Sequence, residues 1–384
     1  MEQDTTFSQV HTIMTEYAER TGLAPVGKTP CRYLWTDAFG VCNFLEMYQK
    51  TGDEHYLNLA LQLVDQVHRI LGRHRADDLR QGWLSGLDEE TGARHPTLGG
   101  LRIGKQLNER EPGAPVDEIL EWDRDGQYYH YLTKWMHALN RVSRVTDDAI
   151  YHTWAIELAK AAHSGFVYLP SASSRKRMYW KMSIDLSRPL EPAMGHHDPL
   201  DGLISCYQLQ ERAAIPALTG EIAELKDICT GQNWATEDPL GIGGLLWNSC
   251  LVAQLIANGR SLLNSLLEDL LNSALVGLES YANTNSLDLP AEYRLAFREF
   301  GLSIGLRGLA TMESLLEDEP KLFIHGERLR TQIENLLHYK PMIDSIEQFW
   351  LQPASRAGNT WRDHRDINEV MLATSLAPDG FLTL

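Results

Sequence analysis

Residues 121–130 hold the densest group of chemically capable side chains in the sequence, with acids, aromatics and a histidine within ten positions. Cleavage of a glycosidic bond needs two carboxyl groups, one as general acid and the other as base or nucleophile. We predict Asp123 and Asp37 as this pair, since each lies close to the start of a predicted buried helix. Asp125 is a further catalytic candidate, although it directly precedes Gly126, where capping of the helix is the alternative role.

Histidines supply a second kind of chemistry. His130 lies one turn inside a predicted buried helix, and His196 and His197 directly precede another. Imidazole titrates near neutrality, so a histidine that faces a cleft can transfer protons. These residues therefore predict a sugar epimerase or isomerase as the alternative to a hydrolase. Packing of His130 in a polar layer of the core, and of the His pair in a loop, is the structural alternative.

No metal or cofactor is predicted. Two His and two Asp stand within residues 196–201, but adjacent histidines seldom converge on one ion, and no Glu/His pair at helical spacing accompanies them. Asp198 directly precedes Pro199 and is predicted to cap a helix. The sequence contains no glycine-rich phosphate loop, serine nucleophile elbow or dinucleotide-binding fingerprint.

Aromatic and charged side chains favour a small saccharide as the substrate. A flat apolar ring can stack on the C–H face of a pyranose, and several tryptophans fall in predicted loops. Residues 175–188 carry five basic side chains against Asp185, which predicts a rim for an anionic sugar, with a solvated surface as the alternative. The predicted substrate-binding residues are Trp35, Trp122, Tyr129, Trp180, Lys176, Arg177, Arg298, Glu299 and Trp361.

Helical periodicity extends over nearly the whole chain, and two kinds of helix alternate. One kind has an apolar stripe and a charged face and is predicted to lie outside; the other is apolar around most of its circumference and is predicted to be buried. The predicted outer helices are residues 5–20, 53–73, 147–165, 219–230, 260–281 and 321–338. The predicted inner helices are residues 37–50, 126–145, 199–213, 239–258, 293–316 and 366–376.

Internal similarity indicates a repeated helical hairpin. Thr51, Asp53 and Tyr56 are matched in order and spacing by Thr146, Asp148 and Tyr151, and each set opens an outer helix. Asp-Pro-Leu occurs before the inner helices at residues 198–200 and 238–240, where we predict a capping Asp followed by Pro. The alternating pattern of residues 176–185 predicts a short β-hairpin. Insertions are expected at about 74–121 and 168–197, which argues against an evenly repeating solenoid.

Six buried and six amphipathic helices in alternation resemble the (α/α)6 toroid of the six-hairpin glycosidase-like superfamily, whose architecture the N-acylglucosamine 2-epimerases share. The segments 34–39 and 48–56 are typical of such proteins. The resemblance implies an all-α fold in one domain over residues 1–384, with a cleft where loops enter the inner helices. The epimerases place a catalytic His in a Met-His-Leu-Leu-Glu-Ala pattern, and residues 129–134 share its His and one Leu.

Composition excludes other partners. The formal net charge is −17, from 35 Lys and Arg against 52 Asp and Glu, which disfavours nucleic acids and anionic membrane surfaces. Five scattered cysteines without a Cys-x-x-Cys pair favour the reducing cytoplasm, and the acidic N-terminus does not indicate a signal peptide. Residues 240–257 are apolar but contain Asn248, Ser249 and Gln254, so we predict a buried helix and not a membrane span.

The sequence thus predicts a carbohydrate-active enzyme, with a glycoside hydrolase as the main hypothesis. Its two carboxyl groups distinguish it from an epimerase or isomerase, which needs two opposed proton-transferring groups and no attacking water. A non-catalytic sugar-binding or scaffold toroid is the third hypothesis. That protein is expected to have aromatic side chains in its cleft and every acid capped or ion-paired.

Overall fold

The computed structural model describes residues 2–27, 29–171, 173–213 and 216–384, and it confirms the alternation of inner and outer helices. The inner helices are α2 (Leu34–Thr51), α6 (Tyr129–Thr146), α8 (Asp198–Arg212), α10 (Pro239–Ala257), α12 (Ala296–Asp318) and α16 (Arg365–Leu376). The outer helices are α1 (Glu2–Arg20), α3 (Glu54–Leu71), α7 (Ala149–Phe166), α9 (Thr219–Cys229), α11 (Asn264–Asn283) and α13 (Gly326–Leu337). A further helix, α14 (Pro341–Leu351), was not predicted.

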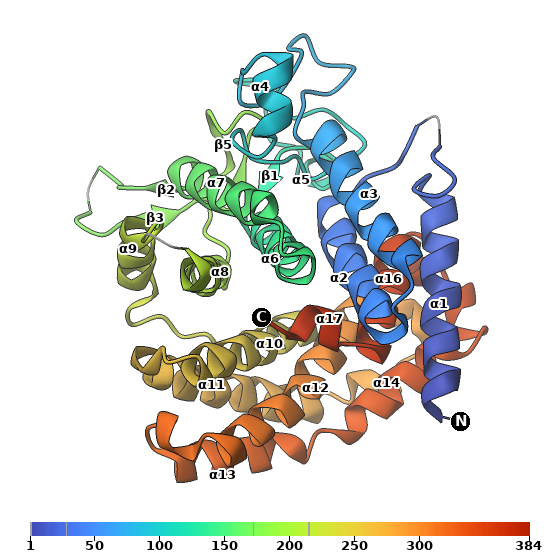
Figure 1. Ribbon diagram of the computed structural model, residues 1–384, viewed down its shortest axis with the longest axis vertical. Coiled ribbons are helices and arrows are strands. Elements are labelled where there is room, and N and C mark those ends of the chain that lie inside the picture. The colour runs from blue at the N-terminus through green and yellow to red at the C-terminus, as the bar shows by residue number, and fades with distance from the viewer. Residues whose placement is uncertain (1, 28, 172, 214–215) are drawn as a thin grey trace. The chain divides into compact units, whose positions relative to one another are not determined.

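The chain divides into two compact units, each built from three helical hairpins. Unit 2 comprises Ala18–Gln232. Its inner helices α2, α6 and α8 contact one another in sequence order, and each packs against the outer helix that follows it, α3, α7 or α9 (Figure 1). Each outer helix covers the inner helix with its apolar stripe and leaves its charged face in solvent, as the periodicity predicts.

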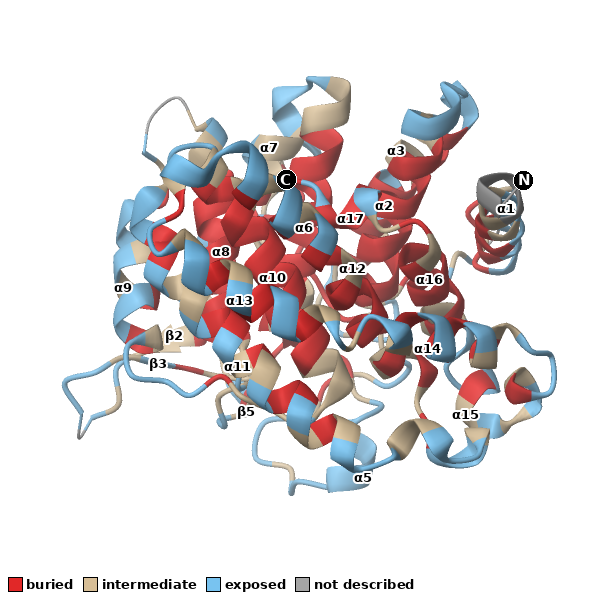
Figure 2. Cartoon of the chain, turned by 90° about the horizontal axis from the view of Figure 1, so that it is seen from below, coloured by how far each residue is buried: buried red, intermediate tan, exposed pale blue. Residues whose placement is uncertain are grey.

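Unit 1 comprises Met1–Tyr17 and Asn233–Leu384. Its inner helices α10 and α12 are buried along most of their length, whereas α13 alternates buried and exposed residues (Figure 2). Glycines allow α10 and α12 to approach closely: a Cβ on Gly243 would lie 2.0 Å from the carbonyl oxygen of Gly301, and one on Gly305 would lie 2.6 Å from that of Gly243. This explains the glycine spacing of α12 without any chemistry.

Helix α10 corresponds to residues 240–257, which were predicted to form a buried helix. By length and composition alone it could cross a membrane, contrary to the expectation from its polar residues. Most of the helix is nevertheless buried, including Asn248 and Ser249, whereas Gln254 is partly exposed. The core position is the one that the sequence predicts, and a mostly buried core helix passes the same length and composition test.

The internal similarity corresponds to the same helix junction formed twice in unit 2. The hydroxyl groups of Thr51 and Thr146 donate to the carbonyl oxygens of Met47 and Val142 at 2.7 and 2.8 Å, closing the inner helices α2 and α6. The side chains of Asp53 and Asp148 then accept the backbone N–H two residues on, each at 2.9 Å, and cap α3 and α7. Each matched set therefore opens an outer helix, as predicted, and Asp is a favoured N-cap residue.

The strands are short and lie in unit 2. A three-stranded sheet has the order β1 (Gln127–Tyr128), β4 (Lys181–Met182), β5 (Pro189–Glu191), and a second sheet pairs β2 (Val167–Tyr168) with β3 (Arg177–Met178), all antiparallel. A β-hairpin is present, but β4 and β5 form it, so its position differs from the predicted residues 176–185. The two strands within that segment belong to different sheets because each pairs with a distant part of the chain.

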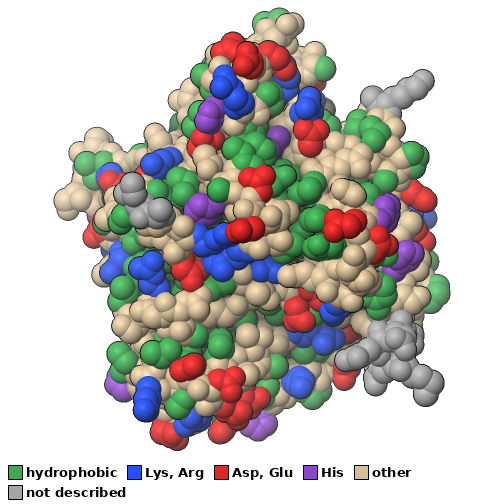
Figure 3. All heavy atoms as spheres, in the orientation of Figure 1, with side chains coloured by type: hydrophobic (Ala, Val, Ile, Leu, Met, Phe, Trp, Pro, Cys, Tyr) green, Lys and Arg blue, Asp and Glu red, His purple; other side chains and the backbone are tan. Residues whose placement is uncertain are grey.

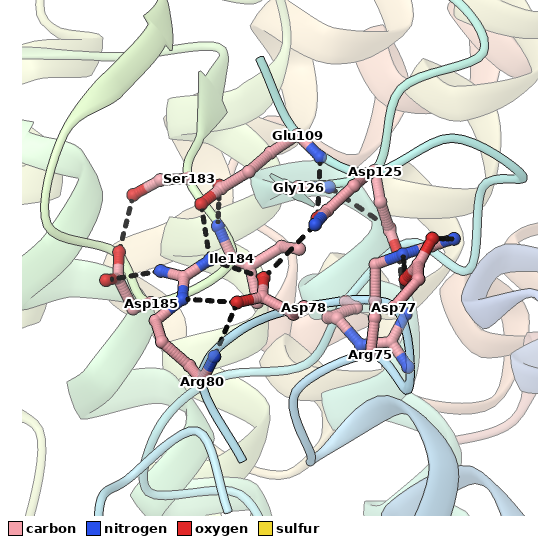
Figure 4. Close-up of polar contacts among 12 residues, drawn as sticks. Arg75, Asp77, Asp78, Arg80, Glu109, Asp125, Gly126, Ser183, Ile184 and Asp185 are labelled. Carbon is pink, nitrogen blue, oxygen red and sulfur yellow. Dashed lines mark hydrogen bonds and ion pairs between the residues drawn. The ribbon is translucent and has the colours of Figure 1, made fainter. Parts of the chain in front are cut away.

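Ion pairs connect the two insertions of unit 2 (Figure 4). The guanidinium of Arg80 contacts Asp78 at 2.8 Å and Glu109 at 2.7 Å in the first insertion, and Asp185 at 2.8 Å in the β4–β5 turn. Glu109 also accepts a hydrogen bond from the backbone N–H of Ile184 at 2.6 Å. We name these five residues the Arg80 network.

Two short helices of the first insertion are largely exposed. They are α4 (Glu89–Arg94) and α5 (Glu118–Glu121). Over α4, at the top of Figure 3, acidic and basic side chains lie next to one another. Here Arg73 pairs with Glu89 at 2.6 Å and Arg94 with Glu90 at 3.6 Å. Such exposed pairs contribute about 0–1 kcal/mol each, so α4 depends on them little.

Candidate active site

Three inner helices of unit 2 bring an imidazole and a carboxylate together at their N-terminal ends. His130 is the second residue of α6, and Asp198 is the first residue of α8. His130 Nδ1 lies 3.3 Å from Asp198 Oδ1, within ion-pairing distance. The ring of Trp35, second in α2, lies 6.0 Å from the imidazole, so the starts of α2, α6 and α8 lie side by side.

Buried polar atoms around this pair lack partners. Asp198 is 4% exposed, and its Oδ2 forms no hydrogen bond with any described residue; the same holds for the buried atoms His130 Nδ1 and Trp35 Nε1. An unpaired buried donor or acceptor costs about 1–3 kcal/mol, and native proteins usually satisfy such atoms with water or a ligand. His130 Nδ1 still faces Asp198 Oδ1, so Asp198 Oδ2 and Trp35 Nε1 are the two atoms here that water or a polar ligand would satisfy.

A second pair of charges lies one helical turn further along the same helices. Lys134 Nζ contacts Asp201 Oδ2 at 2.9 Å, and both side chains are buried. The spacing repeats that of His130 and Asp198 by four residues on α6 and three on α8. The sequence analysis did not predict Asp198, Lys134 or Asp201 as site residues, although this helical spacing is a signal that could have identified them.

Aromatic rings surround His130. Tyr128 stacks on the imidazole with centroids 5.3 Å apart, and Tyr131 meets it edge-on at 4.9 Å. The hydroxyl groups of Tyr33 and Tyr131 lie 2.7 Å apart, so the start of α2 is hydrogen-bonded to that of α6. The imidazole is thus held in a largely apolar enclosure, with 23% of its side chain exposed.

A pocket of about 260 Å³ lies beside this enclosure. Tyr128 separates the two, because its ring also packs against Trp180 at 5.2 Å. Trp122 stands perpendicular to Trp180 at 5.9 Å, with 60% of its surface exposed. The lining residues are Val116, Glu118, Glu121, Trp122, Tyr128, Trp180, Lys181, Leu190 and Glu191. The predicted positions of Trp122 and Trp180 at a cleft are thereby supported by the geometry.

Lys181 forms one wall of this pocket but is itself held by the backbone. Its Nζ donates to the carbonyl oxygens of Glu121 and Arg124 at 2.8 and 2.9 Å. Burial lowers the pKa of Lys181 to about 8, with the Glu121 carboxylate 3.8 Å away acting in the opposite direction. Near neutral pH the side chain therefore remains a cation that fixes the loop after α5.

The carboxylates that were predicted for hydrolysis have different surroundings. Asp37 is 1% exposed, accepts a hydrogen bond from the backbone N–H of Tyr33 at 2.8 Å and lies 3.5 Å from Arg32. It therefore stabilises the start of α2. Asp123 is exposed in the turn after α5, and its carboxylate contacts none of the described residues. The structure gives no contact that joins these two acids into a catalytic pair.

Asp125, a catalytic candidate with helix capping as the alternative role, does not cap α6. Helix α6 begins at Tyr129, and Asp125 is fully buried. Its Oδ2 contacts Arg102 at 2.5 Å and Arg75 at 3.3 Å, while its Oδ1 accepts the backbone N–H of Gly104 at 3.0 Å (Figure 4). A carboxylate with two cationic partners and backbone donors is a structural anchor. It leaves no oxygen for proton transfer to a substrate.

The loop before α8 also differs from the prediction. Residue Asp198 was expected to cap this helix, but His197 holds the N-cap position, since Asp198 turns toward His130. His196 and His197 stack on each other at 4.5 Å, with His196 exposed. The loop passes close to the carboxylate: a Cβ on Gly195 would lie 2.4 Å from Asp198 Oδ2.

Several predicted substrate-binding residues lie in the core instead. Tyr129 is 1% exposed and packs edge-on against Phe166, and Trp361 stacks on Trp350 at 5.6 Å. Glu299 forms a bidentate ion pair with Arg294, at 2.8 and 2.6 Å, and accepts from the Trp350 indole. All three side chains are at most 3% exposed, so we assign them to the core and not to a substrate site.

Arg298 and the basic segment are likewise paired. Arg298 contacts Asp238 at 2.8 Å in unit 1. Lys176 pairs with Glu224, Arg175 donates to backbone carbonyls at the end of α9, and Arg188 donates to the carbonyl of Arg110. Arg177 is exposed on β3. The basic side chains turn to different partners and do not gather around one anion, so these contacts give no support to the predicted basic rim.

Alanine at Lys176 or Arg177 is accordingly expected to change KM equally for uronate-bearing and neutral sugars. A surface cation whose charge is already paired or widely separated from others steers an anionic ligand weakly. Steady-state kinetics with both substrate classes, at low and high salt, measure the difference. A larger rise in KM for the anionic sugar that vanishes in high salt would restore the basic rim.

Comparison with known proteins defines the class of fold. The solved structure of the GH76A alpha-1,6-mannanase from Salegentibacter sp. HEL1_6 matches with a TM-score of 0.54 and 12% identity over 97% of this chain and 99% of the other. The chain therefore has an (α/α)6 toroid fold like that of this mannanase.

Two solved epimerase structures are also similar to this chain. The cellobiose 2-epimerase from Spirochaeta thermophila DSM 6192 has a TM-score of 0.49 at 13% identity, over 95% of this chain and 97% of the other. The one from Bacillus thermoamylovorans B4167 has a TM-score of 0.44 at 11% identity, over 81% and 76%. No family model and no curated protein matches the sequence.

Proposed function

We propose that this protein is a sugar epimerase or isomerase in which His130 transfers the proton. The observation that carries the proposal is the His130–Asp198 pair at the starts of three inner helices, where Asp198 Oδ2 and Trp35 Nε1 are buried without a hydrogen bond to any described residue. A carboxylate beside one imidazole nitrogen fixes the tautomer and ring orientation, which leaves the other nitrogen to exchange a proton. His130 Nε2 is that nitrogen.

The reaction requires an open-chain sugar with a carbonyl group next to a C–H bond. His130 Nε2 removes the proton from the carbon beside the carbonyl, and the C–H electrons form an enediolate. Return of a proton to the other face of the same carbon gives an epimer, and its return to the former carbonyl carbon gives an isomer. His196 and His197, in the loop directly before Asp198, are the residues that we propose for the second transfer.

The same geometry weakens the two rival hypotheses. The hydrolase hypothesis relied on Asp37 and Asp123, of which the first caps a helix beside Arg32. A non-catalytic toroid is expected to have every acid capped or ion-paired; Asp198 is paired with His130 through Oδ1, but its buried Oδ2 has no hydrogen-bond partner among the described residues. The likeness to a mannanase supports a sugar-active enzyme and leaves its reaction open.

Incubation of the protein with aldoses, ketoses and reducing disaccharides in D2O tests the proposal. We expect proton NMR to show loss of the C2–H signal together with appearance of an epimer or isomer. A hydrolase would instead release monosaccharides from a disaccharide without exchange at C2. Cleavage without exchange would overturn the proposal, as would the absence of both reactions on sugars that are shown to bind.

A further inference from the structure

The pocket beside His130 has an excess of negative charge that its own cations do not neutralise. Glu118, Glu121 and Glu191 line it. Glu121 is paired, because Arg110 Nε lies 2.7 Å from its Oε1. Glu191 accepts one backbone N–H, from Ala193 at 3.0 Å, and forms no ion pair within the described part of the chain. Glu118 is exposed at the start of α5 and likewise has no ionic partner there.

Lys181 does not cancel these charges for a ligand. Its side chain is 3% exposed, and Nζ donates two hydrogen bonds, to the carbonyl oxygens of Glu121 and Arg124. A ligand that enters the pocket therefore finds little of this side chain exposed and most of its donors already in use. The available charged groups in the pocket are the carboxylates of Glu118 and Glu191.

Aromatic rings provide the remaining surface. Trp180 and the exposed Trp122 form two perpendicular walls, and Tyr128 forms a third. Such rings stack on the C–H face of a pyranose, and their faces also attract a cation. Carboxylates and aromatic faces together are complementary to a sugar ring that bears a positive charge. The charge of such a sugar is opposite in sign to that of the anionic saccharide predicted from the basic segment.

We propose that this pocket binds a sugar unit with a protonated amino group, so that a hexosamine unit is part of the substrate. Binding of this sugar does not depend on the proposed function; only the reaction that follows binding rests on it. The ring stacks against Trp180 and Trp122, and the ammonium group is bound by Glu191, with Glu118 adding long-range attraction. N-Acetylation removes the charge and the ammonium donors, so the acetylated sugar binds as weakly as a neutral one.

Calorimetric titration with glucosamine, glucose and N-acetylglucosamine at mildly acidic pH tests this inference. One charge-assisted contact predicts roughly 10-fold tighter binding of glucosamine than of the two neutral sugars, with a difference that shrinks in salt. Glu191→Gln is expected to remove most of this preference. Trp180→Ala is expected to weaken all three sugars alike, and Glu317→Gln, exposed on α12, is the matched control.

The outcomes separate the pocket from the reaction. Equal binding of the three sugars in the unmodified protein would overturn the inference, as would an amine without a sugar ring, such as ethanolamine, binding as tightly as glucosamine. Titration of His130→Gln is expected to show the same preference, because binding needs no proton transfer. If the preference persists but no C2 exchange occurs in D2O, the proposed function fails and the assignment of the pocket stands.

Discussion

Replacement of His130 by glutamine is expected to lower kcat by roughly 10²–10⁴-fold, the usual contribution of a positioned proton-transfer group. Glutamine has a similar length and keeps a hydrogen-bonding group near Asp198, but it cannot take up a proton. KM should change far less than kcat, because the aromatic pocket remains intact. Exchange at C2 in D2O and direct assay of product formation both measure the effect.

Two further variants make this result specific. Asp198→Asn removes the charge beside Nδ1, so we expect kcat to fall in the same direction with little change in KM. His55→Gln, at an exposed site on α3, is the matched control and should retain full turnover. Full activity of His130→Gln, with an unchanged free energy of unfolding, would eliminate this histidine as the proton-transferring group.

Replacement of Asp125 by alanine is expected to destabilise the protein by about 3–5 kcal/mol, the range for breaking a buried ion pair from one side. The guanidinium of Arg102, whose side chain is 7% exposed, would lose its anion while it stayed buried. The backbone N–H groups of Gly104 and Gly126 would also lose their acceptor. Urea denaturation monitored by tryptophan fluorescence measures the loss.

The neighbouring Asp123 provides the control for this prediction. Asp123→Ala removes an exposed carboxylate and should change the free energy of unfolding by less than about 0.5 kcal/mol. Asp125→Asn should fall between the two, because an amide oxygen still accepts hydrogen bonds but carries no charge. A loss of only about 1 kcal/mol in Asp125→Ala would indicate the simple helix cap that the sequence suggested.

The helices could be predicted from the sequence because the information that defines them is local. Apolar periodicity and capping residues lie within a few positions of each helix end, and α3 (Glu54–Leu71) agrees with the predicted residues 53–73. Repeated junctions such as Thr51 and Thr146 add a second local signal. The fold class follows from the alternation of these helices, because the sequence of each hairpin specifies its own inner and outer helix.

The candidate site could be predicted only in part, because its contacts join residues that are far apart in the chain. The two Asp-Pro-Leu segments illustrate this: Asp238 holds the N-cap position of α10, while Asp198 becomes the first residue of α8. The distant partner decides the difference, since Asp238 contacts Arg298 and Asp198 contacts His130. Local patterns identified His130 and the tryptophans, but they gave no information on which acid lies beside the histidine.

The Arg80 network has a consequence for engineering the specificity of this protein. One guanidinium joins the loop of residues 74–121 to the β4–β5 turn through three carboxylates, and both segments contribute walls to the aromatic pocket. Substitutions in the two segments are therefore energetically coupled, although about 70 residues separate them in the chain. A graft that exchanges residues 74–121 alone would leave Asp185 without Arg80 and the buried N–H of Ile184 without Glu109, so recombination between homologues should keep the two segments together.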